Sequence, residues 1–128
     1  MIRGVGIDLI EVDRIKKQLE TSSDRFCQSL FSEKEIAYCR RGANTRIQAR
    51  HFAGRFAAKE AFLKAMGTGL REGLAWKDVE VLNNALGKPE LHLKNKVKET
   101  VDKQGITNIQ LSISHGRDMA AAFVILET

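Results

Sequence analysis

The sequence contains no long apolar run and only two cysteines. The longest apolar stretch, Met119 to Leu126, is eight residues, far short of the about 20 residues that a membrane-spanning helix needs. The first residues lack the apolar stretch and small-residue cleavage site of a secretory signal peptide, so we expect a cytoplasmic protein that does not bind membranes. In that compartment Cys27 and Cys39 are expected to be reduced thiols.

The motifs of several common sites are also missing. No Cys/His spacing indicates a zinc site. No Walker loop, G-x-G-x-x-G or G-x-S-x-G motif is present. These absences exclude the most familiar sequence signatures for metal, nucleotide and nucleophilic-serine sites.

A chain of 128 residues has the size of one compact domain, which we expect to span residues 1–128. With 43% apolar and 29% charged residues, the composition is that of a globular protein. Lysine and arginine number 21 and aspartate and glutamate 16, which gives a net charge of +5. That excess suggests an acidic partner.

The excess charge is concentrated in one segment, residues 40–64. This segment holds seven bases and one acid, so the rest of the chain is close to neutral. The bases are Arg40, Arg41, Arg46, Arg50, Arg55, Lys59 and Lys64, and the acid is Glu60. A basic run of this kind is either a solvated helix face or a surface for an anionic ligand.

Apolar periodicity predicts the elements of the first half of the chain. Val5, Ile7 and Leu9 alternate with Gly4, Gly6 and Asp8, the pattern of a strand with one apolar face. A short helix is expected over residues 11–20, and the S-x-x-E sequence at Ser32 predicts a capping box that starts a helix ending near residue 39. Residues 43–66 are alanine-rich and free of proline, which predicts a long helix.

The second half predicts mainly strands. A hairpin is expected from strands over residues 79–82 and 91–93, followed by a short helix over residues 95–104. Residues 108–114 alternate strictly, residues 120–126 are apolar on both faces, and a tight turn joins them. We therefore predict an α+β fold in which a mostly antiparallel sheet packs against a long central helix and shorter helices.

Glu60 falls on the apolar stripe of the long helix, which is an expensive place for an ionised carboxylate. The stripe consists of Ala49, Phe52, Ala53, Phe56 and Leu63. An i,i+4 ion pair with Lys64 is one explanation, and ligation of a metal ion is the other.

Asp8 strengthens the metal interpretation because it ends an apolar strand whose glycines, Gly4 and Gly6, should leave its face open. The alternative role for Asp8 is that of a helix N-cap. Together Asp8 and Glu60 could hold Mg²⁺, with substrate oxygens and water completing the coordination. The neighbouring bases Arg55, Lys59 and Lys64 then suggest a phosphate-bearing substrate.

Two weaker signals lie in the second half. His115 follows Ser114 at a strand end, where it is either a structural histidine or a ligand contact. The Gly87-Lys88-Pro89 turn combines close backbone approach with a cation, although such turns are commonly plain hairpin loops. His51 and His92 have no comparable neighbours in the sequence.

Three segments carry a resemblance to a known family. Residues 4–15 (GVGIDLIEVDRI), 54–69 (GRFAAKEAFLKAMGTG) and 111–116 (LSISHG) resemble the bacterial holo-[acyl-carrier-protein] synthases of the 4′-phosphopantetheinyl transferase superfamily. The motifs occur in the family order, and NALGKPEL at residues 84–91 fits the family's loop. The resemblance implies transfer of 4′-phosphopantetheine from coenzyme A to a serine of an acidic apo acyl carrier protein in fatty acid biosynthesis.

The resemblance also implies roles for individual residues. Asp8 and Glu60 would be the magnesium ligands and, with Lys64, the catalytic residues. Coenzyme A would be bound by Arg55, Lys59, Lys64, Gly87, Lys88, Pro89, Ser114 and His115, and the carrier protein by Arg14 and Arg25. The resemblance further implies a homotrimer whose active sites lie between protomers.

The reaction expected from these roles is an in-line attack of the carrier serine hydroxyl on the β-phosphate of coenzyme A. Lys64 would stabilise charge on the leaving phosphate. The general base that takes the serine proton could be a metal-bound water, or a carboxylate such as Glu60 acting through water.

Two other functions compete with this one. A nucleic-acid-binding module could use residues 40–64 to track phosphates. The aromatics argue against it, because Trp76 and Tyr38 are the only members of their types and Phe52 and Phe56 occupy core positions. A non-catalytic basic scaffold would leave Asp8 and Glu60 unexplained.

Overall fold

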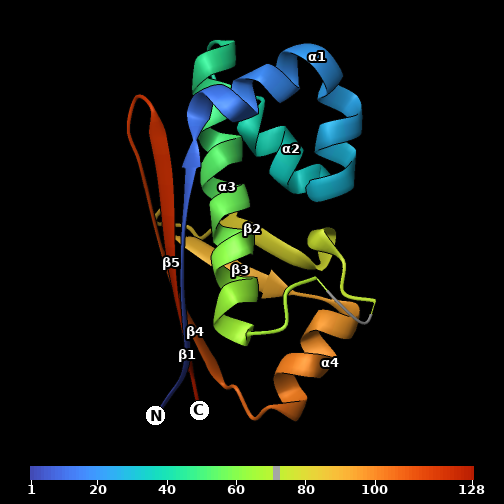
Figure 1. Cartoon of the computed structure of the whole chain (residues 1–128), viewed down its shortest axis with the longest axis vertical. Helices are drawn as coiled ribbons and strands as arrows, with labels where there is room; N and C mark the ends of the chain where they lie inside the picture. The colour runs from blue at the N-terminus through green and yellow to red at the C-terminus, as the bar shows by residue number, and fades with distance from the viewer. Residues whose placement is uncertain (71–72) are drawn as a thin grey trace.

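The central element of the fold is the helix α3 (Thr45–Met66), which runs beside the strands along most of the molecule (Figure 1). The computed structural model describes residues 1–70 and 73–128. The Asn44 side chain caps the first turn of α3 by accepting a hydrogen bond from the Ile47 N–H, and Gly67 ends the helix with a φ of 78°. The long helix expected over residues 43–66 is therefore confirmed.

The first helix is longer than its sequence pattern predicts. The helix α1 (Val12–Leu30) continues to Leu30 with a kink at Ser22, where the expected helix covered only residues 11–20. Its second half is held by buried Cys27 and by the ring of Phe26, which packs 5.9 Å from that of Phe31. These tertiary contacts stabilise a segment whose own periodicity is weak.

The capping box is present where it was expected. The helix α2 (Glu33–Cys39) starts with the Ser32 hydroxyl accepting from the Glu35 N–H, while the Glu35 carboxylate accepts from the Ser32 N–H.

The strands form two antiparallel sheets, where the sequence led us to expect one. The larger has the order β1 (Ile2–Glu11), β5 (Met119–Glu127), β4 (Asn108–His115). The smaller pairs β2 (Val79–Asn83) with β3 (Pro89–Leu93) and follows a short 3₁₀ turn, Trp76–Asp78. The helix α4 (Asn95–Lys103) connects β3 to β4.

The apolar face of β1 points away from α3, and its glycine face points toward that helix. Val5, Ile7 and Leu9 point to solvent with 51%, 62% and 64% of their surface exposed. The glycine face packs against α3 instead, so closely that a Cβ on Gly4 would lie 2.2 Å from the Ala65 carbonyl oxygen. The glycines therefore do not leave open space; they let the helix backbone approach the strand.

Small residues also make up the buried side of α3. Ala49, Ala53, Ala57, Ala58 and Ala61 are fully buried, with Phe52 and Phe62 filling the space between the helix and its neighbours. Across the described residues, no helix combines the length and the apolar character required to span a membrane.

Candidate active site

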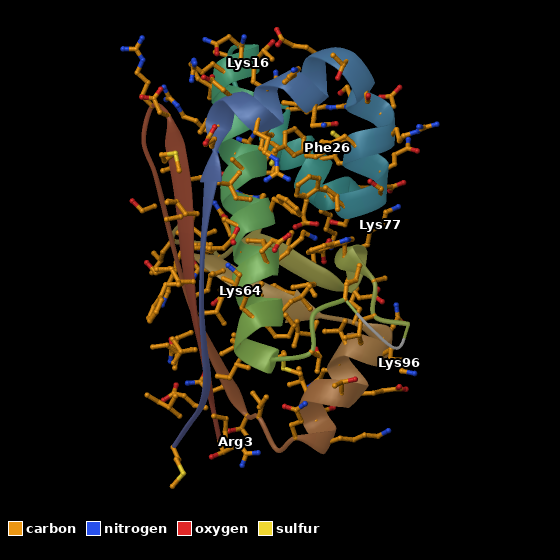
Figure 2. All side chains as sticks on the ribbon, viewed as in Figure 1. Arg3, Lys16, Phe26, Lys64, Lys77 and Lys96 are labelled. Atoms are coloured by element: carbon orange, nitrogen blue, oxygen red, sulfur yellow. The ribbon has the colours of Figure 1, made fainter. Side chains whose placement is uncertain are left out.

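The two acids singled out in the sequence lie together beside α3. The Lys64 ammonium donates to Asp8 Oδ1 at 2.9 Å and to the Ile7 carbonyl oxygen at 3.1 Å. Figure 2 shows Lys64 on α3 next to β1. Burial raises the pKa of Glu60, the negative charge of Asp8 raises it further, and Lys64 and Arg14 oppose the rise. Strand β1, helix α3 and the first turn of α1 thus bring four charged side chains to one place.

Three details differ from the sequence-based picture. Glu60 is only half-buried and lines a hollow with Leu63, Lys64 and Trp76, so it does not lie in the core. Lys64 forms its ion pair with Asp8 rather than with Glu60. Asp8 is not a helix cap, because α1 begins after Glu11.

The donor set at Asp8 and Glu60 suits a hard divalent cation. The negative charge of Asp8 contributes to the raised pKa of Glu60, and a cation held between the two carboxylates would relieve this repulsion. Among residues 1–70 and 73–128, no group of three or more His, Cys, Asp or Glu side chains gathers in a metal-binding arrangement. Mg²⁺, which commonly takes one or two carboxylates together with substrate phosphates and water, fits this pair.

A second cluster surrounds Arg55. This side chain is 5% exposed, and its guanidinium lies 4.0 Å over the Tyr38 ring. One nitrogen, Nη2, donates to Asn83 Oδ1 at 3.0 Å, whereas the buried Nε has no hydrogen-bond partner among the residues that the structure describes. A hollow at this point is lined by Tyr38, His51, Gly54, Arg55, Asn83, Gly87, Pro89, Ile113 and His115, with no carboxylate among them. The buried guanidinium thus has no carboxylate partner among these lining residues, which makes the hollow a candidate site for an anion.

The remaining predicted coenzyme contacts are dispersed. Lys59 is fully buried, and its ammonium donates to Glu35 Oε1 at 2.8 Å and to the Trp76 carbonyl oxygen at 2.9 Å, so it is not available to a phosphate. Lys88 is exposed at the tip of the β2–β3 hairpin. Ser114 is exposed and lies on the other face of β4 from His115, because successive strand residues alternate.

The Asp8 cluster and the Arg55 cluster lie on opposite flanks of α3. Glu60 and His51 are nine residues apart, which places them on opposite sides of a helix with about 100° per residue. In the sheet, Ala122 pairs with Asp8 on one side and with Ile113 on the other. The two clusters are therefore separated by two strand spacings, about 10 Å, as well as by the helix.

His51 is a site residue that the sequence analysis missed. It lies one turn before Arg55 on α3, and its ring meets those of Tyr38 and His115 edge to face, at 5.4 Å and 5.9 Å between centroids. The signal in the sequence that could have identified His51 is its i,i+4 spacing to Arg55. The partner His115 is 64 positions away in sequence, so only the fold reveals the contact.

The two arginines expected to meet the carrier protein occupy different parts of α1. Arg14 is exposed in its first turn, at a hollow lined by Leu9, Glu11 and Lys17, close enough to Glu60 to affect its pKa. Arg25 is exposed beyond the kink at Ser22. Only Arg14 adjoins the acid pair.

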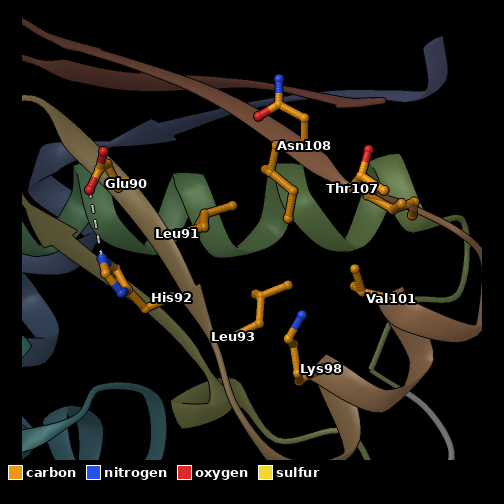
Figure 3. A pocket seen from close by; sticks show the side chains of 10 residues that line it. Glu90, Leu91, His92, Leu93, Lys98, Val101, Thr107 and Asn108 are labelled. Atoms are coloured by element: carbon orange, nitrogen blue, oxygen red, sulfur yellow. Dashed lines mark ion pairs between the residues drawn. The ribbon is translucent and has the colours of Figure 1, made fainter. Parts of the chain in front are cut away.

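Another hollow, between β3, β4 and α4, contains none of the predicted site residues (Figure 3). Leu91, Leu93 and Val101 line it together with polar side chains, among which His92 Nε2 lies 3.8 Å from Glu90 Oε1.

Comparison with known proteins identifies the family. Residues 4–124 match the model of the 4′-phosphopantetheinyl transferase superfamily. The holo-[acyl-carrier-protein] synthase of Geobacter sp. (strain M21) is 46% identical over 127 residues, which are 99% of each chain.

Solved structures agree with the sequence match. The crystal structure of holo-[acyl-carrier-protein] synthase from Neisseria meningitidis superimposes with a TM-score of 0.86 at 31% identity, covering 100% of both chains. The Bacillus anthracis holo-(acyl-carrier-protein) synthase in complex with CoA (3′,5′-ADP) superimposes with a TM-score of 0.80 at 38% identity, covering 100% of this chain and 98% of that one. The chain therefore belongs to the holo-[acyl-carrier-protein] synthase family of the 4′-phosphopantetheinyl transferase superfamily.

Proposed function

We propose that this protein transfers 4′-phosphopantetheine from coenzyme A to a serine of an acidic apo acyl carrier protein, in the cytoplasm and in fatty acid biosynthesis. The observation that carries the proposal is the grouping of Asp8 and Glu60 beside Lys64. The relatives named holo-[acyl-carrier-protein] synthase and the solved relative with bound coenzyme A support the choice of reaction and co-substrate.

In this reaction the carrier serine oxygen forms a bond to the β-phosphorus of coenzyme A, and the bond from that phosphorus to the bridging oxygen breaks. The leaving group is adenosine 3′,5′-bisphosphate, and the serine proton passes to a base. Lys64 is half-exposed and paired with Asp8, so its ammonium would be available to stabilise negative charge that develops on the leaving phosphate.

Asp8 and Glu60 would hold Mg²⁺ through their carboxylate oxygens. When bound, the ion neutralises charge on the pyrophosphate and on the transition state. The chain contributes the two acids from a strand and a helix that pack through Gly6, which fixes the distance between them.

The nucleotide end of coenzyme A is assigned to the cluster around Arg55. The Arg55 guanidinium supplies positive charge and hydrogen-bond donors, the His115 ring lines the same hollow, and Gly87 and Pro89 of the hairpin loop supply a wall that a purine ring can approach. Lys88 at the same loop adds positive charge from its exposed position.

The separation of the two clusters favours a site built from two protein copies. One coenzyme A molecule must meet both clusters, yet α3 stands between them in a single chain. The outer face of the large sheet offers an interface, since it exposes Val5, Ile7, Leu9 and Phe123. A homotrimer that buries this face and places its sites between protomers satisfies both observations.

Incubating the purified protein with coenzyme A, Mg²⁺ and an apo acyl carrier protein, and then weighing the carrier by mass spectrometry, tests the function. We expect the carrier to gain one phosphopantetheine and the gain to require Mg²⁺. No mass gain with several carriers, together with salt-sensitive binding to nucleic acid, would favour the nucleic-acid-binding alternative.

A further inference from the structure

The pocket around Arg55 has an excess of positive and protonatable groups. Arg50 and Arg55 belong to α3, His115 to β4, and all three lower the pKa of His51. Tyr38 of α2 covers the pocket from the side opposite β4. No acid is among the groups that shift the pKa of His51, and the buried Nε atom of Arg55, which lines the pocket, has no hydrogen-bond partner within residues 1–70 and 73–128. The pocket therefore has unsatisfied capacity for negative charge.

His51 occupies the middle of this pocket. Its ring is packed nearly perpendicular to Tyr38 on one side and to His115 on the other, at interplanar angles of 79° and 81°. Edge-to-face contacts on both sides fix the ring plane. The residue is only half-buried, so the imidazole remains accessible to a bound molecule.

We propose that His51 is a nucleotide-binding residue, whose imidazole contacts a phosphate of the adenosine 3′,5′-bisphosphate portion of coenzyme A and takes up a proton as that portion binds. The inference rests on the proposed function, because it assigns the nucleotide to this pocket. It makes the affinity for the nucleotide depend on pH through one named side chain.

The direction of the effect follows from the charges. Burial lowers the pKa of His51, and electrostatic repulsion from Arg55, His115 and Arg50 lowers it further, so the charged ring is disfavoured in the free protein. A phosphate in the pocket cancels the repulsion from Arg55 and His115, which raises the pKa of His51 in the complex. Binding is then tighter at acidic pH and weakens as the pH rises through the pKa of the complex.

The test is calorimetric titration of the full chain with adenosine 3′,5′-bisphosphate at about pH 6 and about pH 8, in buffers of different ionisation enthalpy, so that protons taken up can be counted. The variants are His51→Phe, which keeps an aromatic ring, and His51→Gln, which keeps a polar group that cannot be charged. His92→Phe is the control, because His92 is exposed and lines the separate hollow between β3 and β4.

We expect the affinity for the nucleotide to increase from about pH 8 to about pH 6 in the wild-type protein and in His92→Phe. This increase should be about tenfold larger than in either His51 variant, which corresponds to one charge-assisted hydrogen bond. The phosphate of the ligand titrates in the same range, but its contribution is common to every variant and cancels in the comparison. Proton uptake should fall in both His51 variants. Repeating the titration with adenosine 3′-monophosphate and 5′-monophosphate shows which phosphate produces the difference.

Equal pH dependence and equal proton uptake in wild type and both His51 variants would overturn the proposal while leaving the transferase function standing, provided that carrier modification persists. A wild-type protein that neither binds the nucleotide nor modifies a carrier would overturn the proposed function and the role of His51 together. Loss of the pH-dependent difference in only the His51 variants, with circular dichroism showing an unchanged fold, supports the assignment.

Discussion

The ammonium of Lys59 and the carboxylate of Glu35 form an ion pair of 2.8 Å in which neither side chain is exposed to solvent. Glu35 also accepts hydrogen bonds from the backbone N–H groups of Ser32 and Val81. The pair thus connects α3, the start of α2 and the strand β2. Glu60, the next residue after Lys59, extends from the same helix toward β1. Adjacent residues of one motif therefore have different roles: Lys59 stabilises the interior, and Glu60 belongs to the candidate active site.

This arrangement predicts that Lys59→Met destabilises the fold by about 3–5 kcal/mol, because it leaves the Glu35 carboxylate buried without a counter-charge. Urea denaturation measures the loss. The double variant Lys59→Met with Glu35→Leu should recover much of the stability, whereas Lys16→Met, which breaks an exposed pair with Glu20, should cost about 0.5 kcal/mol or less. A Lys59→Met protein with wild-type stability and weakened coenzyme A binding would instead support a phosphate contact.

The close approach of β1 and α3 predicts that Gly6→Ala is destabilising, because the new Cβ would lie 1.8 Å from the Ala61 carbonyl oxygen. The strand must then move away from the helix, which should lower the free energy of unfolding by about 1–3 kcal/mol or more. Gly116→Ala is the matched control, since no atom in the described part of the chain lies within 4 Å of a Cβ there. Thermal melting of the two variants measures the difference, and equal melting temperatures would refute this account of the glycine face.

The acid pair predicts that Asp8→Asn and Glu60→Gln each abolish magnesium-dependent carrier modification, because one carboxylate ligand of the cation is lost. Both substitutions keep the size and shape of the side chain and remove only its charge, so circular dichroism and melting should change little. Glu20→Gln, an exposed acid on α1, should retain full activity. Chelation of Mg²⁺ in the wild-type protein should reproduce the loss. Normal turnover in either Asp8→Asn or Glu60→Gln would reject the metal assignment.

The position of Arg14 beside the acid pair predicts that Arg14→Glu raises the apparent KM for the acidic carrier protein far more than that for coenzyme A. Steady-state kinetics with each substrate varied in turn make the comparison. Arg25→Glu, beyond the kink of α1, tests whether the docking surface extends along the helix. Equal changes in both KM values would exclude Arg14 as a docking residue.

The exposed apolar face of β1 predicts that Ile7→Lys disrupts the proposed trimer, because a charge would be buried in its interface. Light scattering coupled to gel filtration should show a smaller particle, and transfer activity should fall with it if the site lies between protomers. Glu99→Lys on exposed α4 is the control for added charge. A wild-type protein that is monomeric and fully active would contradict the shared site.

Several features of the fold and the site could be predicted from the sequence because their causes are local. The capping box at Ser32 and the extent of α3 depend on neighbouring residues, and both were correct. Asp8, Glu60 and Lys64 were also identified from motif and charge, and the fold brings them together. The second half of α1 was missed, because it is held by contacts to Phe31 and the core rather than by its own pattern.

The sequence by itself determined most of the elements, the family and the concentration of charge on one helix, since each can be identified from motifs and patterns within short stretches of the chain. Only the tertiary structure decided which face of β1 meets α3 and which lysine is buried. It also brought the rings of His51 and His115 into contact. Period-two alternation identifies two faces of a strand but does not say which is inside. For β1 the close fit of helix backbone against Gly4 and Gly6 outweighs burial of Val5, Ile7 and Leu9, and leaves those three side chains exposed.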